Sequence, residues 1–175
     1  MSVDPGRASA SYGEYRHAYD PVANPELFEG VLTARVVAFL IDVVVLAVPV
    51  IAVSLFIFVS GFLTFGLGWL LFWPLHGAAV VWAVLYYGFT LGGAASATVG
   101  MRAMGIEMRT WYGTPCYFVL GAVHAIVYWI SVSMLTPFVL LVGLFNGRRR
   151  LLHDMLLGTV VINSPSRAAR YGRRR

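Results

Sequence analysis

An apolar stretch from Val31 to Phe65 limits most strongly how this chain can fold. The stretch is longer than the roughly 20 residues that a helix needs to cross the hydrocarbon core of a bilayer. Its only charged residues are Arg35 and Asp42. A carboxylate near the middle of such a helix needs a proton, a partner or water, because its charge costs about 2.5–3.5 kcal/mol at the bilayer centre. Asp42 is therefore the first candidate for a functional residue.

Two further apolar blocks, 67–90 and 116–146, follow the first one, and short polar segments separate them. Hydrophobic residues make up 59% of the chain and charged residues 12%, which is typical of integral membrane proteins. We therefore expect an all-α, multi-pass membrane protein with about three transmembrane segments, near residues 31–60, 67–90 and 116–146.

The third block has 31 residues, too many for one average crossing and too few for two full ones. Pro137 lies inside it and predicts a kink or a re-entrant turn. All thirteen basic residues are arginine, and eight of them lie between 147 and 175, which places the C-terminus in the cytoplasm under the positive-inside rule. If the arginines of the loop before this block are also cytoplasmic, the block enters and returns. Three plain crossings with an external N-terminus are the alternative.

The polar ends divide the chain into three parts. Residues 1–30 are acidic and rich in proline, and they read as a flexible arm; residues 31–163 form the transmembrane domain; residues 164–175 form a basic tail. We expect the tail to lie near anionic lipid headgroups, and we expect no nucleic-acid partner. The single cysteine, Cys116, excludes an intrachain disulfide and a metal site built from several cysteines.

Arg35 and Asp42 are seven residues apart and therefore lie almost on one face of a helix, together with Ala38. They are also separated by a rise of about 10 Å, so we expect Arg35 to extend to the headgroups instead of pairing with Asp42. Asp42 then needs a partner from another segment, and Ala38 is small enough to let that segment approach. The candidate partners are His124, His76, Arg102 and bound water.

Three stretches of the chain resemble the RDD family of bacterial membrane proteins, which is named for one arginine and two aspartates. They are ARVVAFLID (34–42), SATVGMRAMGIEMRT (96–110) and RRRLLHDMLLGTVVI (148–162). The resemblance assigns the signature positions to Arg35, Asp42 and Asp154. It implies a multi-pass protein of the bacterial plasma (inner) membrane, and it implies involvement in transport without a settled mechanism.

The chain departs from the family pattern at His124, where many members carry arginine, and at Leu152, where an aromatic residue is common. If that arginine neutralises the buried aspartate in other members, the resemblance passes this role to His124, whose charge depends on pH. We expect the second and third stretches to form one collar at the cytoplasmic face, with 148–162 amphipathic and interfacial. Asp154 would cap a helix there or pair with a nearby arginine: Arg102, Arg109 or Arg35.

Gly88 and Gly92 form a GxxxG motif that either seats a partner helix or marks the glycine-rich exit from the membrane. No sequence motif for nucleotide binding or catalysis is present, so we expect neither an enzyme nor a cofactor. His153 precedes Asp154, but the histidines are scattered along the sequence and have no ligand spacing typical of zinc. We therefore expect no metal site.

Two functions remain from this reading. In the first, the protein is a transporter in which Asp42 binds or passes a proton or cation, with His124 or Arg35 tuning its charge. Three short spans enclose little volume, so this function favours a homo-oligomer. In the second, the protein is a membrane adaptor or regulator that binds a partner membrane protein and transports nothing. An Asp42→Asn change distinguishes them, because it removes ionisation and keeps the shape of the side chain.

Overall fold

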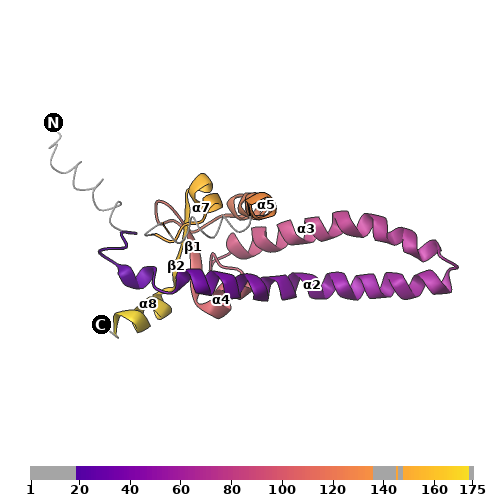
Figure 1. The fold of residues 1–175 in the computed structure, drawn as a ribbon, viewed down its shortest axis with the longest axis horizontal. Coiled ribbons are helices and arrows are strands. Elements are labelled where there is room, and N and C mark those ends of the chain that lie inside the picture. Colours follow the sequence, from indigo (N-terminus) through magenta and orange to yellow (C-terminus); the bar gives the residue numbers. More distant parts are fainter. Residues whose placement is uncertain (1–18, 136–144, 146–147, 174–175) are drawn as a thin grey trace.

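The computed structural model describes residues 19–135, 145 and 148–173, and helices dominate it (Figure 1). The helices and strands follow one another in this order: η1 (Pro25–Leu27), α2 (Val31–Leu63), η2 (Leu67–Leu71), α3 (Phe72–Leu91), α4 (Val99–Met104), β1 (Ile106–Thr110), α5 (Phe118–Leu135), α7 (Leu152–Leu157), β2 (Thr159–Asn163) and α8 (Pro165–Gly172).

Helices α2 and α3 form a long antiparallel hairpin that projects beyond the rest of the protein (Figure 1). The turn between them uses Gly66 at φ +98°, and Gly61 and Gly68 let the chain segments on either side of the turn meet. Both arms, Pro25–Leu63 and Leu67–Leu91, are long and apolar enough to cross a membrane. Only 17% and 6% of their most apolar windows are buried, whereas a core helix of a soluble protein would be mostly covered. These apolar surfaces are therefore available to lipid.

Helix α5 packs on the C-terminal half of α3, and Figure 1 shows it nearly end-on, so it crosses the hairpin instead of running along it. Gly88 and Gly92 make this contact possible. A Cβ atom on Gly92 would lie 2.4 Å from the backbone nitrogen of Phe118, and one on Gly88 would meet the Phe118 ring. The GxxxG motif thus seats a helix of the same chain. Pro137, where we predicted a kink or re-entrant turn, lies outside the described residues.

A two-stranded antiparallel sheet joins the second and third family-like stretches at one end of the hairpin. Strand β1 pairs with β2, with Met108 opposite Val161. The expectation of an amphipathic interfacial segment over 148–162 is wrong, because α7 ends at Gly158 (φ +62°) and the strand that follows is buried along its whole length. The sheet adds a small β element to an otherwise helical fold.

Helix α8 lies within the segment that we expected to be a basic tail. Its residue Ala168 is buried, and the Arg167 guanidinium donates to the carbonyl of Met104 and lies over the Tyr171 ring. The helix packs against η1 and β2. At least this part of the basic C-terminal segment is folded onto the body of the protein.

Candidate functional site

Asp42 is buried inside the hairpin, with 3% of its surface exposed, and it accepts hydrogen bonds from three neutral donors. The Tyr86 hydroxyl of α3 donates to Oδ1 at 2.6 Å, and the Gly100 backbone N–H of α4 donates to the same oxygen at 2.8 Å. The Thr98 hydroxyl donates to Oδ2 at 2.6 Å. Asp42 therefore ties α2 to both α3 and α4.

Small residues bring α4 close enough to reach Asp42. A Cβ atom on Gly100 would lie only 2.1 Å from the carbonyl oxygen of Ala38, so only glycine fits at this crossing. Thr98 caps the start of α4 by accepting a hydrogen bond from the Met101 N–H. The small residue Ala38 does admit another segment, and that segment is α4.

The side chains that we proposed as partners of Asp42 lie elsewhere. His76 is exposed on α3, and its Nδ1 lies 2.8 Å from the Phe72 carbonyl oxygen. Arg102 donates from Nε to the Ala97 carbonyl at 3.0 Å. Among residues 19–135 and 148–173, no cationic side chain hydrogen-bonds to Asp42. The prediction missed that hydroxyls and a backbone N–H can satisfy a buried carboxylate without a counter-charge.

Arg35 pairs with Asp154, the second acidic signature position. The Arg35 Nη1 to Asp154 Oδ2 distance is 2.5 Å, and the two side chains are 11% and 0% exposed. The expectation that Arg35 extends to the headgroups is wrong, because this buried carboxylate neutralises it. The expectation that Arg35 does not pair with Asp42 agrees with this geometry.

Asp154 also makes hydrogen bonds with the segments before and after it in the chain. Its Oδ2 accepts the Leu151 N–H at 3.0 Å and so caps α7, as we expected of this residue. Arg150 donates to the Asp154 backbone carbonyl at 2.8 Å and to the Thr159 carbonyl at 2.9 Å. The carboxylate thus connects the start of α2 to the segment that leads into β2.

Charge and burial set the protonation states of Asp154 and His153. Burial alone would raise the pKa of Asp154, but the Arg35 guanidinium together with His153 and His124 outweighs burial, and the pKa is lowered to about 2. Burial lowers the pKa of His153 to about 4, against the opposing effect of Asp154. His153 is therefore neutral at pH 7, and its Nε2 lies 3.7 Å from Asp154 Oδ1 as an uncharged neighbour.

His124 approaches the second aspartate and not the first. Its Nε2 lies 3.9 Å from Asp154 Oδ1, and its ring centroid lies 5.0 Å from that of His153. From the resemblance we expected His124 to neutralise a buried aspartate, and we named His124 as a partner of Asp42. The fold instead places it beside Asp154, because α5 and α7 pack together.

The two remaining arginine candidates lie apart from both aspartates. Arg109 of β1 bonds Glu107 through Nε and Nη2 at 3.0 and 2.9 Å, and its side chain is 23% exposed. Arg102, described above, bonds the backbone of the loop before α4. Of the three arginines that we considered for Asp154, Arg35 alone pairs with it in the described part of the chain.

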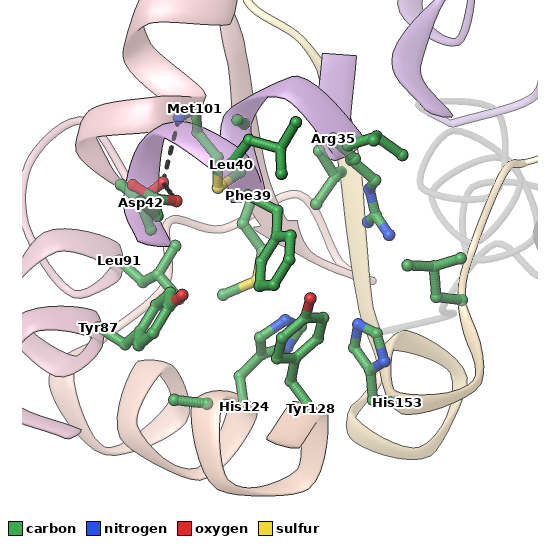
Figure 2. Close-up of a pocket in the computed structure, with 17 residues that line it drawn as sticks. Arg35, Phe39, Leu40, Asp42, Tyr87, Leu91, Met101, His124, Tyr128 and His153 are labelled. Carbon is green, nitrogen blue, oxygen red and sulfur yellow. Dashed lines mark hydrogen bonds between the residues drawn. The ribbon is translucent and has the colours of Figure 1, made fainter. Parts of the chain in front are cut away.

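A cavity of about 340 Å³ extends from Asp42 to Arg35, the partner of Asp154, and to His153. Figure 2 shows Asp42 at one end, Arg35 and His153 at the other, and Phe39 between them. His124 and Tyr128 of α5 line the floor in this view. The remaining wall is mostly apolar, from the following residues: Val36, Ala38, Leu40, Tyr87, Leu91, Thr98, Met101, Met108, Ala125, Leu151 and Val161.

The family model for RDD proteins matches residues 30–158, about three quarters of the chain. This chain belongs to the RDD family. The matched range includes Arg35, Asp42 and Asp154, to which the resemblance assigned the signature positions, and the match confirms the family resemblance seen in the sequence. Searches of curated proteins and of solved structures gave no match to this RDD protein.

Proposed function

We propose that this RDD protein is a membrane transport protein that moves a proton or small cation by way of Asp42. The observation that supports this most strongly is the cavity, because a buried carboxylate lines it together with His124, His153 and the Arg35 guanidinium. Buried ionisable side chains around a cavity within a membrane helix bundle mark ion and proton pathways.

The hydrogen bonds of Asp42 suit exchange of a proton or cation. A salt bridge would have to break before the carboxylate could take up a cation, whereas the hydroxyls of Tyr86 and Thr98 can reorient. Their oxygen atoms can also face a bound cation, since hydroxyl and carboxylate oxygens are ligands of hard cations. Neutral donors thus allow Asp42 to change its protonation or its ligand without loss of the surrounding fold.

The proposal places the α2–α3 hairpin across the bacterial plasma membrane, with the arginine-rich C-terminus in the cytoplasm. Two apolar helices with exposed side chains and the biased arginines support this arrangement. Arg170 and Arg173, at the end of α8, would then lie near anionic lipid headgroups. Because so few helices enclose little volume, the proposal includes a homo-oligomer.

The test is flux of H⁺ and Na⁺ into proteoliposomes, with the wild type and Asp42→Asn at equal protein-to-lipid ratios. The variant can keep its contacts: the amide oxygen can accept from Gly100 and Tyr86, while the amide nitrogen faces the Thr98 hydroxyl, which can accept. We expect flux to fall at least tenfold, because the amide cannot ionise. Tyr86→Phe is the control that removes one donor and keeps the carboxylate; it should retain measurable flux.

Equal flux in the wild type and Asp42→Asn would contradict the role of Asp42. The adaptor or regulator alternative predicts a different pattern: neither protein carries H⁺ or Na⁺, and both retain the same partner membrane protein after mild detergent extraction. Thermal unfolding of each variant in detergent verifies that the comparison is made between folded proteins.

A further inference from the structure

We propose that His124, His153 and Asp154 bind one divalent transition-metal ion, of which Zn²⁺ is the best fit. The three residues come from α5 and α7, and one ligand atom from each lies within 4.8 Å of the others. The transport role of Asp42 does not require this site, and the site does not require that anything crosses the membrane.

Two of the three distances between the ligand atoms need to shorten only slightly to hold the ion. The two histidine Nε2 atoms lie 3.9 and 3.7 Å from Asp154 Oδ1. Zn²⁺ binds nitrogen and oxygen at about 2.0–2.2 Å in tetrahedral geometry, which places neighbouring ligand atoms about 3.4 Å apart. The two distances to Asp154 Oδ1 therefore need to shorten by only a few tenths of an ångström. The ligand nitrogens of the two imidazoles lie within 4.8 Å of each other, and side-chain rotations would bring them to the same spacing.

The hydrogen bonds of Asp154 leave its Oδ1 atom available to a metal ion. Arg35 and the Leu151 N–H occupy Oδ2, whereas Oδ1 has only a 3.4 Å contact with the Thr159 hydroxyl. Oδ1 is the oxygen that faces both imidazoles. Asp154 can thus hold Arg35 with one oxygen and a metal ion with the other.

The His153 imidazole has the outer contact that metal-ligating histidines usually have. His153 Nδ1 lies 3.4 Å from the Ser131 hydroxyl, and outer partners of this kind orient a ligating ring. His124 Nδ1 is buried and has no hydrogen-bond partner within the described ranges. Nε2 of His124 is the nitrogen that faces Asp154 Oδ1 and the ring of His153 packs beside it, so Nε2 is the ligand atom that His124 offers.

The cavity supplies both access and an open coordination position. His124 and His153 line it, so a metal ion can reach them and complete its fourth bond with water from this side. Asp42 lines the opposite end of the same cavity. Two imidazoles and one carboxylate favour Zn²⁺ over Mg²⁺ or Ca²⁺, which prefer oxygen ligands.

The experiment is a calorimetric titration of the full-length protein in detergent with Zn²⁺, after purification with a tag that contains no histidine. We expect one Zn²⁺ per chain for the wild type and at least tenfold weaker binding for His124→Phe and His153→Phe. Phenylalanine keeps the ring and removes the nitrogens. His76→Phe is the matched control, because His76 is exposed on α3 outside the cluster.

Cobalt gives a second readout. Co²⁺ bound by these three ligands and water should show the visible absorption of a four-coordinate ion, and His124→Phe should abolish that absorption. The proposal is overturned if wild type and His124→Phe bind Zn²⁺ equally, if His76→Phe removes the binding, or if the wild type binds no Zn²⁺. If His153→Phe unfolds, His124→Phe decides alone, since its thermal unfolding can be compared with that of the wild type.

Discussion

Asp154→Ala is expected to lower the free energy of unfolding by about 3–5 kcal/mol, because it leaves the buried Arg35 guanidinium without its counter-charge. Two other Arg35 nitrogens, Nε and Nη2, already lack hydrogen-bond partners in the described part of the chain. Removal of the carboxylate therefore leaves Nη1 without its partner as well. The variant also removes the cap that Asp154 places on Leu151.

Denaturant titration in detergent micelles, followed by tryptophan fluorescence, measures this loss. The matched control is the double variant Arg35→Met and Asp154→Leu, which replaces the ion pair with apolar side chains of similar size. It should be clearly more stable than Asp154→Ala, because no unpaired charge stays buried. If Asp154→Ala and the double variant are equally stable, the ion pair with Arg35 is not the source of the stability that Asp154 contributes.

The same pair predicts how stability depends on pH. The folded pKa of Asp154 is lowered to about 2, below the value of about 3.9 for an unfolded aspartate. Its contribution is therefore present above about pH 4 and is lost as the pH falls toward 2. The free energy of unfolding of the wild type should therefore fall relative to that of the double variant over this range.

Gly100→Ala is expected to have the second largest effect, a loss of about 3 kcal/mol or more from steric overlap and a weakened hydrogen bond to a carboxylate. The new Cβ would lie 2.1 Å from the Ala38 carbonyl oxygen. Both atoms belong to backbone or are fixed to it, so α2 and α4 must separate. That separation would lengthen the 2.8 Å hydrogen bond from the Gly100 N–H to Asp42.

Gly77→Ala is the control for this change. Gly77 is also in a helix, but a Cβ atom there would meet nothing within 4 Å. Alanine is favoured over glycine in a helix by about 0.5–1 kcal/mol, so this variant should be slightly more stable than the wild type. A Gly100→Ala protein as stable as Gly77→Ala would contradict the close crossing of α2 and α4. Denaturant titration in detergent measures both variants.

Hydropathy could predict the long helices, whereas residue type could only limit the partner of Asp154 to a few arginines. Apolar runs of sufficient length indicated α2 and α3, since a helix is the simplest structure that satisfies its own backbone in lipid. The position of Asp154 just after the start of a short apolar run indicated a cap. The family resemblance supplied Arg35 as one of three possible partners, and the geometry of α7 selected it.

The sheet and the histidine cluster could not be read from local patterns. Strands β1 and β2 have five residues each and are separated by about fifty residues of other structure, so no hairpin signal joins them. His124 and His153 meet only because α5 and α7 pack together, and their spacing in the sequence gives no ligand motif. The donors of Asp42 give no signal in the sequence, because Tyr86 and Thr98 supply neutral hydroxyls, which are common in apolar segments and carry no charge to mark them.

Filling the cavity beside Asp42 tests most directly our proposal that a transported ion passes through it. Ala125 of α5 lines the cavity and is 2% exposed, so Ala125→Leu adds carbon atoms to that space without changing Asp42 or its donors. Ala122→Leu is the control, because Ala122 is buried on the same helix outside the cavity lining.

The measurement is proton and sodium flux in proteoliposomes with equal amounts of each folded protein. We expect Ala125→Leu to lower the flux at least tenfold, and we expect the flux through Ala122→Leu to stay near that of the wild type. Wild-type flux through Ala125→Leu would contradict the proposal, because the ion would then cross the membrane without using the cavity.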